Sequence, residues 1–117
     1  MRVYYQAEDL TIQELQGSNT DSSWSTGSTL PGPSNSSLTP LEGTAIASVG
    51  WNGNNIRTYF QDTNNSLWEA QYNAGSWSAS PVRLNVPVLL KPQTPIAAMS
   101  QYGSDVSSNL RFTDVLA

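Results

Sequence analysis

Two arginine–glutamate pairs with the same spacing are the side chains best suited to hold a polar ligand. Arg2 precedes Glu14 by twelve positions, and Arg57 precedes Glu69 by the same twelve. A guanidinium fork and a carboxylate can together bind neighbouring hydroxyl groups through charge-assisted hydrogen bonds. Because the chain has only five basic and nine acidic residues among 117, two pairs at one spacing indicate a shared role.

Aromatic residues follow each pair. Tyr72 and Trp77 come shortly after Glu69, and Trp24 comes after Glu14. An aromatic ring offers a flat apolar wall to the C–H face of a pyranose ring. The polar pair and the wall together predict sugar recognition. A structural salt bridge that recurs with each repeat also explains the pairs, so both interpretations stay open at this point.

The pairs belong to a longer repeat with an offset of 55 positions. Residues that recur at this offset are Arg2, Tyr4, Tyr5, Gln6, Ile12 and Glu14, which become Arg57, Tyr59, Phe60, Gln61, Leu67 and Glu69. One unit contains four short candidate strands, at 44–50, 56–61, 66–72 and around Trp77. Such repeats are typical of β-propeller blades. One aromatic of each repeated pair is expected to pack in the core.

We therefore predict an all-β fold of β-propeller blades, each with four antiparallel strands, in a single partial-propeller domain over residues 1–117. Residues 1–31 supply strands two to four of a first blade, and residues 43–80 form a second blade. Residues 93–117 supply strands one and two of a further repeat. The segments between them are rich in Pro, Gly and Ser and lack periodicity, which predicts connecting loops.

Just over two blades leave a propeller open, since closed propellers have about four to eight. One interpretation is a piece of a longer propeller. The other is a homo-oligomer, in which three copies close a ring of six blades and residues 94–100 of one copy complete the first blade of the next. We favour the homotrimer.

Composition argues against several classes of function. The net charge is −4 and the five basic residues are scattered, so neither nucleic acid nor an anionic membrane surface is an expected partner. The chain has no His and no Cys, which excludes His-dependent nucleophile arrangements and disulfides. No cofactor and no metal site are expected. The first ten residues lack the apolar core of a signal peptide, which favours a cytoplasmic location, non-classical release or a recombinant fragment.

The stretches "MRVYYQ", "TAIASVGW" and "IRTYFQDTNNSLWEAQY" resemble the repeats of the fungal fucose-specific lectins of the Aleuria aurantia type. They are also similar to the two-repeat bacterial fucose lectins. The resemblance implies a six-bladed propeller that binds fucosylated glycans between adjacent blades. It implies that Arg2 and Glu14 bind fucose hydroxyls, that Tyr72 and Trp77 form the apolar wall, and that Ile56 lies near the sugar methyl group.

The same resemblance implies a second site at Arg57 and Glu69, with Trp24 of a neighbouring copy as its wall. The first repeat departs from the family here, because it has Gly17 where an aromatic residue often follows the glutamate. This site therefore departs further from the family pattern than the first. Arg111 has no glutamate partner after it, so no third site is expected.

Two other functions are alternatives to a lectin. A sialidase-like propeller glycosidase would need a catalytic carboxylate pair or a tyrosine nucleophile with an arginine cluster. The stretch "SNTDSSW" resembles a sialidase Asp box but lacks its glycine and occurs once. Because a catalytic centre is usually unique whereas these pairs repeat, we expect no enzyme. A protein-interaction propeller without a sugar site is the remaining alternative.

Overall fold

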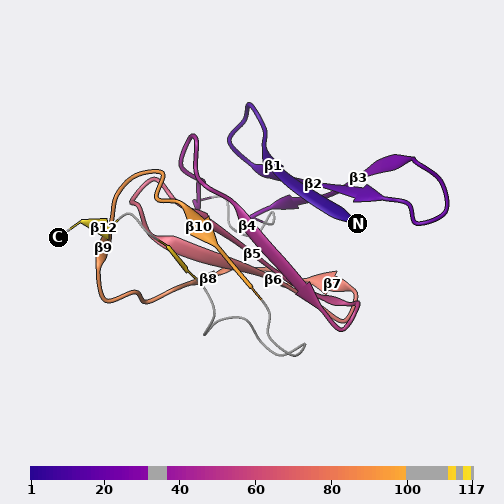
Figure 1. Cartoon of the computed structure of the whole chain (residues 1–117). Helices are drawn as coiled ribbons and strands as arrows, with labels where there is room; N and C mark the ends of the chain where they lie inside the picture. Colours follow the sequence, from indigo (N-terminus) through magenta and orange to yellow (C-terminus); the bar gives the residue numbers. More distant parts are fainter. Residues whose placement is uncertain (32–36, 100–110, 113–114, 117) are drawn as a thin grey trace.

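The computed structural model describes residues 1–31, 37–99, 111–112 and 115–116, and these form antiparallel sheets (Figure 1). The first sheet has the strand order β1 (Arg2–Gln6), β2 (Ile12–Gly17), β3 (Trp24–Leu30). The second has the order β4 (Ala47–Trp51), β5 (Asn55–Gln61), β6 (Leu67–Asn73), β7 (Ser76–Trp77), and β8 (Val82–Arg83) also pairs with β6. This part of the chain contains no helix that could cross a membrane.

Two short pairings follow the second sheet. Strand β10 (Ile96–Ala97) pairs with β11 (Arg111–Phe112), and β9 (Leu89–Leu90) pairs with β12 (Val115–Leu116). The β10–β11 pair lies where the sequence predicts strands one and two of a further repeat. The side chain of Arg111 lies outside the described residues.

The 55-residue repeat extends to the pairing of individual residues across neighbouring strands. Arg2 lies opposite Gln16 and Tyr4 opposite Glu14 in the first sheet. The second sheet pairs Arg57 with Gln71 and Tyr59 with Glu69. Because directly opposed residues share one face of a sheet, each repeat places the same four side chains side by side. The expected all-β fold of antiparallel blades is confirmed.

The connecting segment after the second blade is more structured than the sequence predicts. Strands β8 and β9 lie within residues 81–93, which were expected to be a loop, and β8 extends the second sheet past residue 80. Both strands are two residues long and stand between prolines at 81, 87 and 92. Because Pro cannot donate a ladder hydrogen bond, short edge pairings of this kind leave no period-two signal.

Two apolar clusters lie on opposite faces of the second sheet. Phe60 packs with Ile12, Leu30 and Ala70 between the two sheets, and the neighbouring Tyr59 packs with residues of the other face. Both aromatic rings are fully buried. Successive side chains of a strand point to opposite faces, so both members of this aromatic pair serve as core. The sequence predicted one core residue in each aromatic pair, whereas both members of the pair are core residues in the second repeat.

The repeated glutamines hold the connections between blades. The Gln6 amide donates to the carbonyls of Leu10 and Leu41 and accepts from Gly43 N. The buried Gln61 amide makes the corresponding bonds in the second repeat, donating to the Asn65 and Lys91 carbonyls and accepting from Thr94 N. Each glutamine thus ties its own hairpin turn to the segment that enters the following strand. This accounts for the recurrence of Gln at position six of the repeat.

Candidate functional site

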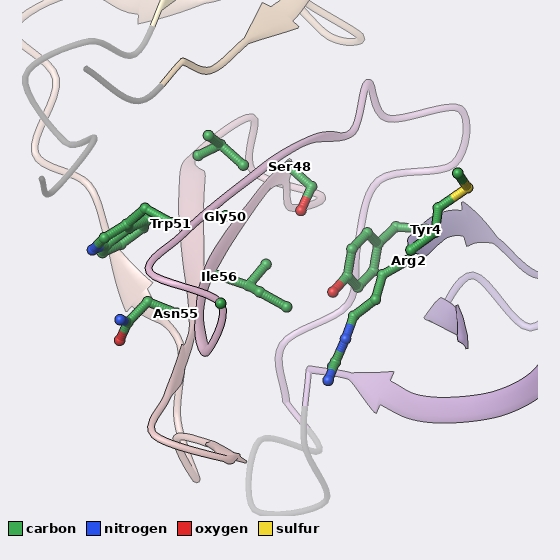
Figure 2. A pocket seen from close by; sticks show the side chains of 10 residues that line it. Arg2, Tyr4, Ser48, Gly50, Trp51, Asn55 and Ile56 are labelled. Carbon is green, nitrogen blue, oxygen red and sulfur yellow. The ribbon is translucent and has the colours of Figure 1, made fainter. Parts of the chain in front are cut away.

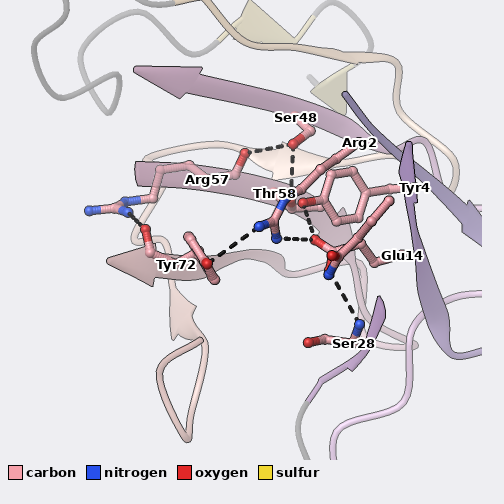
Figure 3. Close-up of polar contacts among 9 residues, drawn as sticks. Arg2, Tyr4, Glu14, Ser28, Ser48, Arg57, Thr58 and Tyr72 are labelled. Atoms are coloured by element: carbon pink, nitrogen blue, oxygen red, sulfur yellow. Dashed lines mark hydrogen bonds and ion pairs between the residues drawn. The ribbon is translucent and has the colours of Figure 1, made fainter. Parts of the chain in front are cut away.

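Glu14 is the centre of a polar cluster on the inner face of the first sheet (Figure 3). Its Oε2 accepts from Arg2 Nη1 at 2.8 Å and from the Tyr4 hydroxyl at 2.7 Å. Its Oε1 accepts from Gln16 Nε2 at 3.0 Å and from Ser28 N at 3.3 Å. A carboxylate has about four lone-pair positions, so this arrangement of donors fills them all.

The donors keep the Glu14 carboxylate ionised although its side chain is fully buried. Burial by itself raises the pKa of Glu14, but hydrogen bonds from Tyr4, Gln16, Arg2 and Ser28 outweigh burial and hold this pKa below its ordinary value. Burial and the bond to Glu14 raise the pKa of the Tyr4 hydroxyl. The cluster therefore presents a fixed negative charge beside a fixed positive one.

Gly27 leaves the space that Glu14 occupies. A β-bulge at Gln13/Leu15 sets Gly27 on β3 against the Glu14 side chain. A Cβ atom at this position would overlap Glu14 Oε1 and lie 2.9 Å from Gln16 Nε2. Glycine is required here for close approach.

We expect Gly27→Ala to lower the free energy of unfolding by about 1 to 3 kcal/mol, because the added methyl group overpacks a buried carboxylate. The measurement is urea unfolding at neutral pH. Thr26→Ala, an exposed position on the same strand, serves as the matched control and should change stability by less than about 0.5 kcal/mol. Equal stability of Gly27→Ala and wild type would show that Glu14 moves aside without cost.

Two aromatic side chains of the second sheet face Arg2. Arg2 Nη2 donates to the Tyr72 hydroxyl at 3.3 Å, and the guanidinium carbon lies 4.5 Å from the Tyr72 ring centroid. Trp77 contacts Tyr72 edge-on at 5.4 Å and Tyr4 at 6.0 Å between ring centroids. The Trp77 Nε1 is buried without a hydrogen-bond acceptor among the described residues. Four of the five residues predicted for the first site, Arg2, Glu14, Tyr72 and Trp77, therefore lie together.

A cavity of about 440 Å³ opens beside Arg2, between the first sheet and the β4–β5 hairpin (Figure 2). Residues of both sheets line it, including Arg2, Tyr4, Ser48, Trp51, Asn55 and Ile56. Ile56 is thus within reach of a ligand that also touches Arg2. The first sheet contributes the charged Arg2, and the second contributes both apolar side chains and the polar Ser48 and Asn55.

The second arginine–glutamate pair has a different geometry. Arg57 Nε lies 3.7 Å from Glu69 Oε1, which is an ion pair but too long for a hydrogen bond. Arg57 Nη1 donates instead to the carbonyls of Ile56 at 2.9 Å and Tyr72 at 3.3 Å. The guanidinium lies over Trp51, 4.9 Å from the ring centroid. Trp24, predicted as the wall of this site, is half exposed on the first sheet with its ring over Gly17.

Sequence reasoning missed two residues of the first cluster. Tyr4 was assigned to a recurring aromatic pair, but its hydroxyl also donates to Glu14. Gln16 was not singled out at all, although Gln16 and Gln71 recur at the same offset of 55 as the arginines. Extending the comparison two residues past each glutamate would have found this pair.

Comparison with known proteins identifies the family. The profile of the fungal fucose-specific lectins matches residues 1–112. The chain belongs to this family. That assignment agrees with the resemblance of the repeated stretches.

Individual relatives of this fungal fucose-specific lectin chain cover most of its length. The fucose-specific lectin of Aleuria aurantia is 34% identical over 111 residues, which are 92% of this chain and 32% of that lectin. Fucose-specific lectin g276 of Arthrobotrys oligospora is 30% identical over 103 residues, 85% of this chain and 26% of that lectin. The chain thus spans about a third or less of these relatives.

A solved structure supports the fold. The crystal structure of AofleA from Arthrobotrys oligospora superposes with a TM-score of 0.64 at 21% identity, over 89% of this chain and 30% of that one. At this identity the likeness concerns the backbone arrangement. The blades of this fungal fucose-specific lectin chain therefore have the β-propeller form expected from the repeat.

Proposed function

We propose that this chain binds L-fucose and fucosylated glycans as a lectin, at the cluster of Arg2, Glu14, Tyr72 and Trp77. The observation that supports this most directly is the junction of the two sheets. An ionised arginine–glutamate pair with a buried carboxylate on one sheet meets two aromatic rings on the other, and the Trp77 indole N–H has no acceptor among the described residues. Family membership supports the same function.

The chemistry of each group suits a deoxy sugar. Arg2 and the Trp77 N–H donate to sugar hydroxyl groups, and Glu14 accepts from a sugar hydroxyl that takes the place of one of its present donors, the longest of which is the 3.3 Å bond from Ser28 N. The bond from Arg2 to the Tyr72 hydroxyl is long at 3.3 Å, so a sugar hydroxyl can replace it at small cost. Ile56 and the aromatic rings offer apolar contacts to the C–H face and the methyl group of fucose.

Binding without catalysis fits the electrostatics of Glu14. A glycosidase general acid needs a raised pKa so that it carries a proton at neutral pH. Here the hydrogen bonds to Glu14 lower its pKa, which opposes that role. An aryl fucoside incubated with the protein should release no phenol.

The direct test is isothermal titration with α-methyl-L-fucoside, with α-methyl-D-glucoside as the control sugar. We expect binding at millimolar affinity or better for the fucoside and no heat for the glucoside. No heat from the fucoside at millimolar concentration would contradict the proposal, and the repeated pairs would then be structural salt bridges.

We further propose that copies of the chain associate, with the homotrimer as the favoured form. The outer face of the first sheet exposes Val3 and Tyr5 by 43% and 42%. Their equivalents 55 positions later, Thr58 and Phe60, are fully buried, and Phe60 packs against Ile12 and Leu30 of the first sheet. The exposed face of the first sheet therefore corresponds to the face of the second sheet that packs in the sheet–sheet interface. We expect a second copy of the chain to cover it.

Association would give Arg57 and Glu69 an aromatic wall from Trp24 of another copy. In the repeat, Gly17 takes the place of Tyr72, so this second site lacks one ring and should bind fucose less tightly than the first. We expect Arg57→Ala to lower the fitted stoichiometry from about two sugars per chain towards one. Titration calorimetry measures this, and light scattering of the same samples gives the mass of the assembly. A stoichiometry that Arg57→Ala leaves unchanged would contradict the second site.

A further inference from the structure

In both repeats the glutamate is held by the same two neutral side chains. The Tyr4 and Tyr59 hydroxyls donate to Oε2 of Glu14 and Glu69, each at 2.7 Å. On the other oxygen, Gln16 Nε2 donates to Glu14 Oε1 at 3.0 Å, and Gln71 Nε2 donates to Glu69 Oε1 at 2.6 Å. Each carboxylate therefore has one oxygen on a tyrosine and the other on a glutamine.

The arginine differs between the repeats while these bonds do not. Arg2 donates to Glu14, but Arg57 is turned to backbone carbonyls and makes no hydrogen bond to Glu69. Glu69 nevertheless keeps the same tyrosine and glutamine partners. The carboxylate position thus does not depend on the arginine, and the tyrosine and glutamine are the groups that orient it.

We propose that Gln16 is a positioning residue of the fucose site, which fixes the plane of the Glu14 carboxylate through Oε1 and so directs the carboxylate towards the sugar hydroxyls. Gln71 has the same role for Glu69. The inference rests on the proposed fucose site. Register favours it, because Gln16 lies directly opposite Arg2 on the neighbouring strand, as Gln71 lies opposite Arg57.

The amide is suited to this task because it is neutral. Among the described residues, the charged or titratable groups that face Glu14 are Arg2 and Tyr4 on β1, and Tyr72 reaches the cluster through Arg2. Because the Gln16 amide carries no charge, it can donate to Glu14 Oε1 while Arg2 keeps its ion pair with Oε2. Its loss should leave Oε1 with only the longer bond from Ser28 N.

The test compares Gln16→Met with wild type in fucoside titrations from about pH 4 to pH 8. Methionine keeps the length of the side chain and removes the donor. Because a hydrogen bond to a charged group is lost, we expect affinity at neutral pH to fall about tenfold or more. Affinity should also decline at a higher pH on acidification, because a carboxylate with fewer donors protonates more readily. Gln13→Met, on the opposite face of β2, is the matched control and should bind like wild type at the Arg2–Glu14 site.

A second variant makes the test independent of how well Gln16→Met folds. Gln16→Glu keeps the shape but sets two carboxyl groups together, so it should bind poorly at neutral pH. Acidification should restore part of its affinity, because the introduced carboxyl group then gains a proton to donate. This pH dependence is opposite to that of wild type, and a purely structural role would not reverse it.

The outcomes separate the two proposals. If wild type binds fucoside and Gln16→Met binds equally well with the same pH profile, the positioning role is wrong. If wild type does not bind, the fucose site itself is wrong. In that case the pKa of Glu14, measured by carboxyl NMR titration of the free protein, tests whether Gln16 orients the carboxylate. An unchanged pKa of Glu14 in Gln16→Met would overturn that role.

Discussion

Glu14→Gln should lower the affinity of the Arg2–Glu14 site for fucose by at least about a hundredfold. Glu14 accepts from donors on both oxygens, whereas a glutamine amide has one acceptor oxygen and one NH2 group. One end of the new amide must therefore face a donor, and the charge that a sugar hydroxyl would meet is gone. Two charge-assisted bonds at about 1.5 to 3 kcal/mol each account for the size of the loss.

The same substitution should also lower the free energy of unfolding. Removing one partner of a buried ion pair costs roughly 3 to 5 kcal/mol, and the lower end applies because the Arg2 side chain keeps 27% exposure. Fucoside titration and urea unfolding measure the two effects. Glu8→Gln removes the same charge from an exposed turn and should alter neither. Fucose binding by Glu14→Gln at wild-type affinity would remove Glu14 from the site.

Phe60→Ala should cause the largest loss of stability, about 3 to 5 kcal/mol. The ring is fully buried between the two sheets, in contact with Ile12, Leu30 and Ala70. Its removal leaves a cavity at the interface that also aligns Tyr72 with Arg2. Urea unfolding measures the change, and we expect fucose affinity to fall with it because the sheets lose their mutual orientation.

The chain provides a matched control for Phe60→Ala at the equivalent position of the first repeat. Tyr5 lies 55 residues earlier and is 42% exposed, so Tyr5→Ala should cost less than about 1 kcal/mol in an isolated chain. A cost close to that of Phe60→Ala, and one that grows with protein concentration, would instead indicate that another copy covers Tyr5. Unfolding at two protein concentrations distinguishes the cases.

Much of the fold followed from the repeat. The constant offset of 55 and the four short candidate strands of each unit predicted antiparallel blades, and the observed pairing of Tyr4 with Glu14 and of Tyr59 with Glu69 repeats at this offset. A period of two fixes the face of each side chain, so grouping the arginine and glutamate of one repeat required only the sequence. The edge strands β8 and β9 were missed because two-residue pairings beside prolines have no periodic signal.

The sequence alone determined the family resemblance, the blade repeat and the two polar pairs, because all of these depend on local periodicity and residue type. Only the tertiary structure decided that the pairs differ, with Arg2 on Glu14 and Arg57 on the carbonyls of Ile56 and Tyr72. It also decided that Gly27 makes room for the carboxylate. The reason is physical: rotamers of long charged side chains depend on which neighbours supply donors and space, and those neighbours come from strands far apart in the chain.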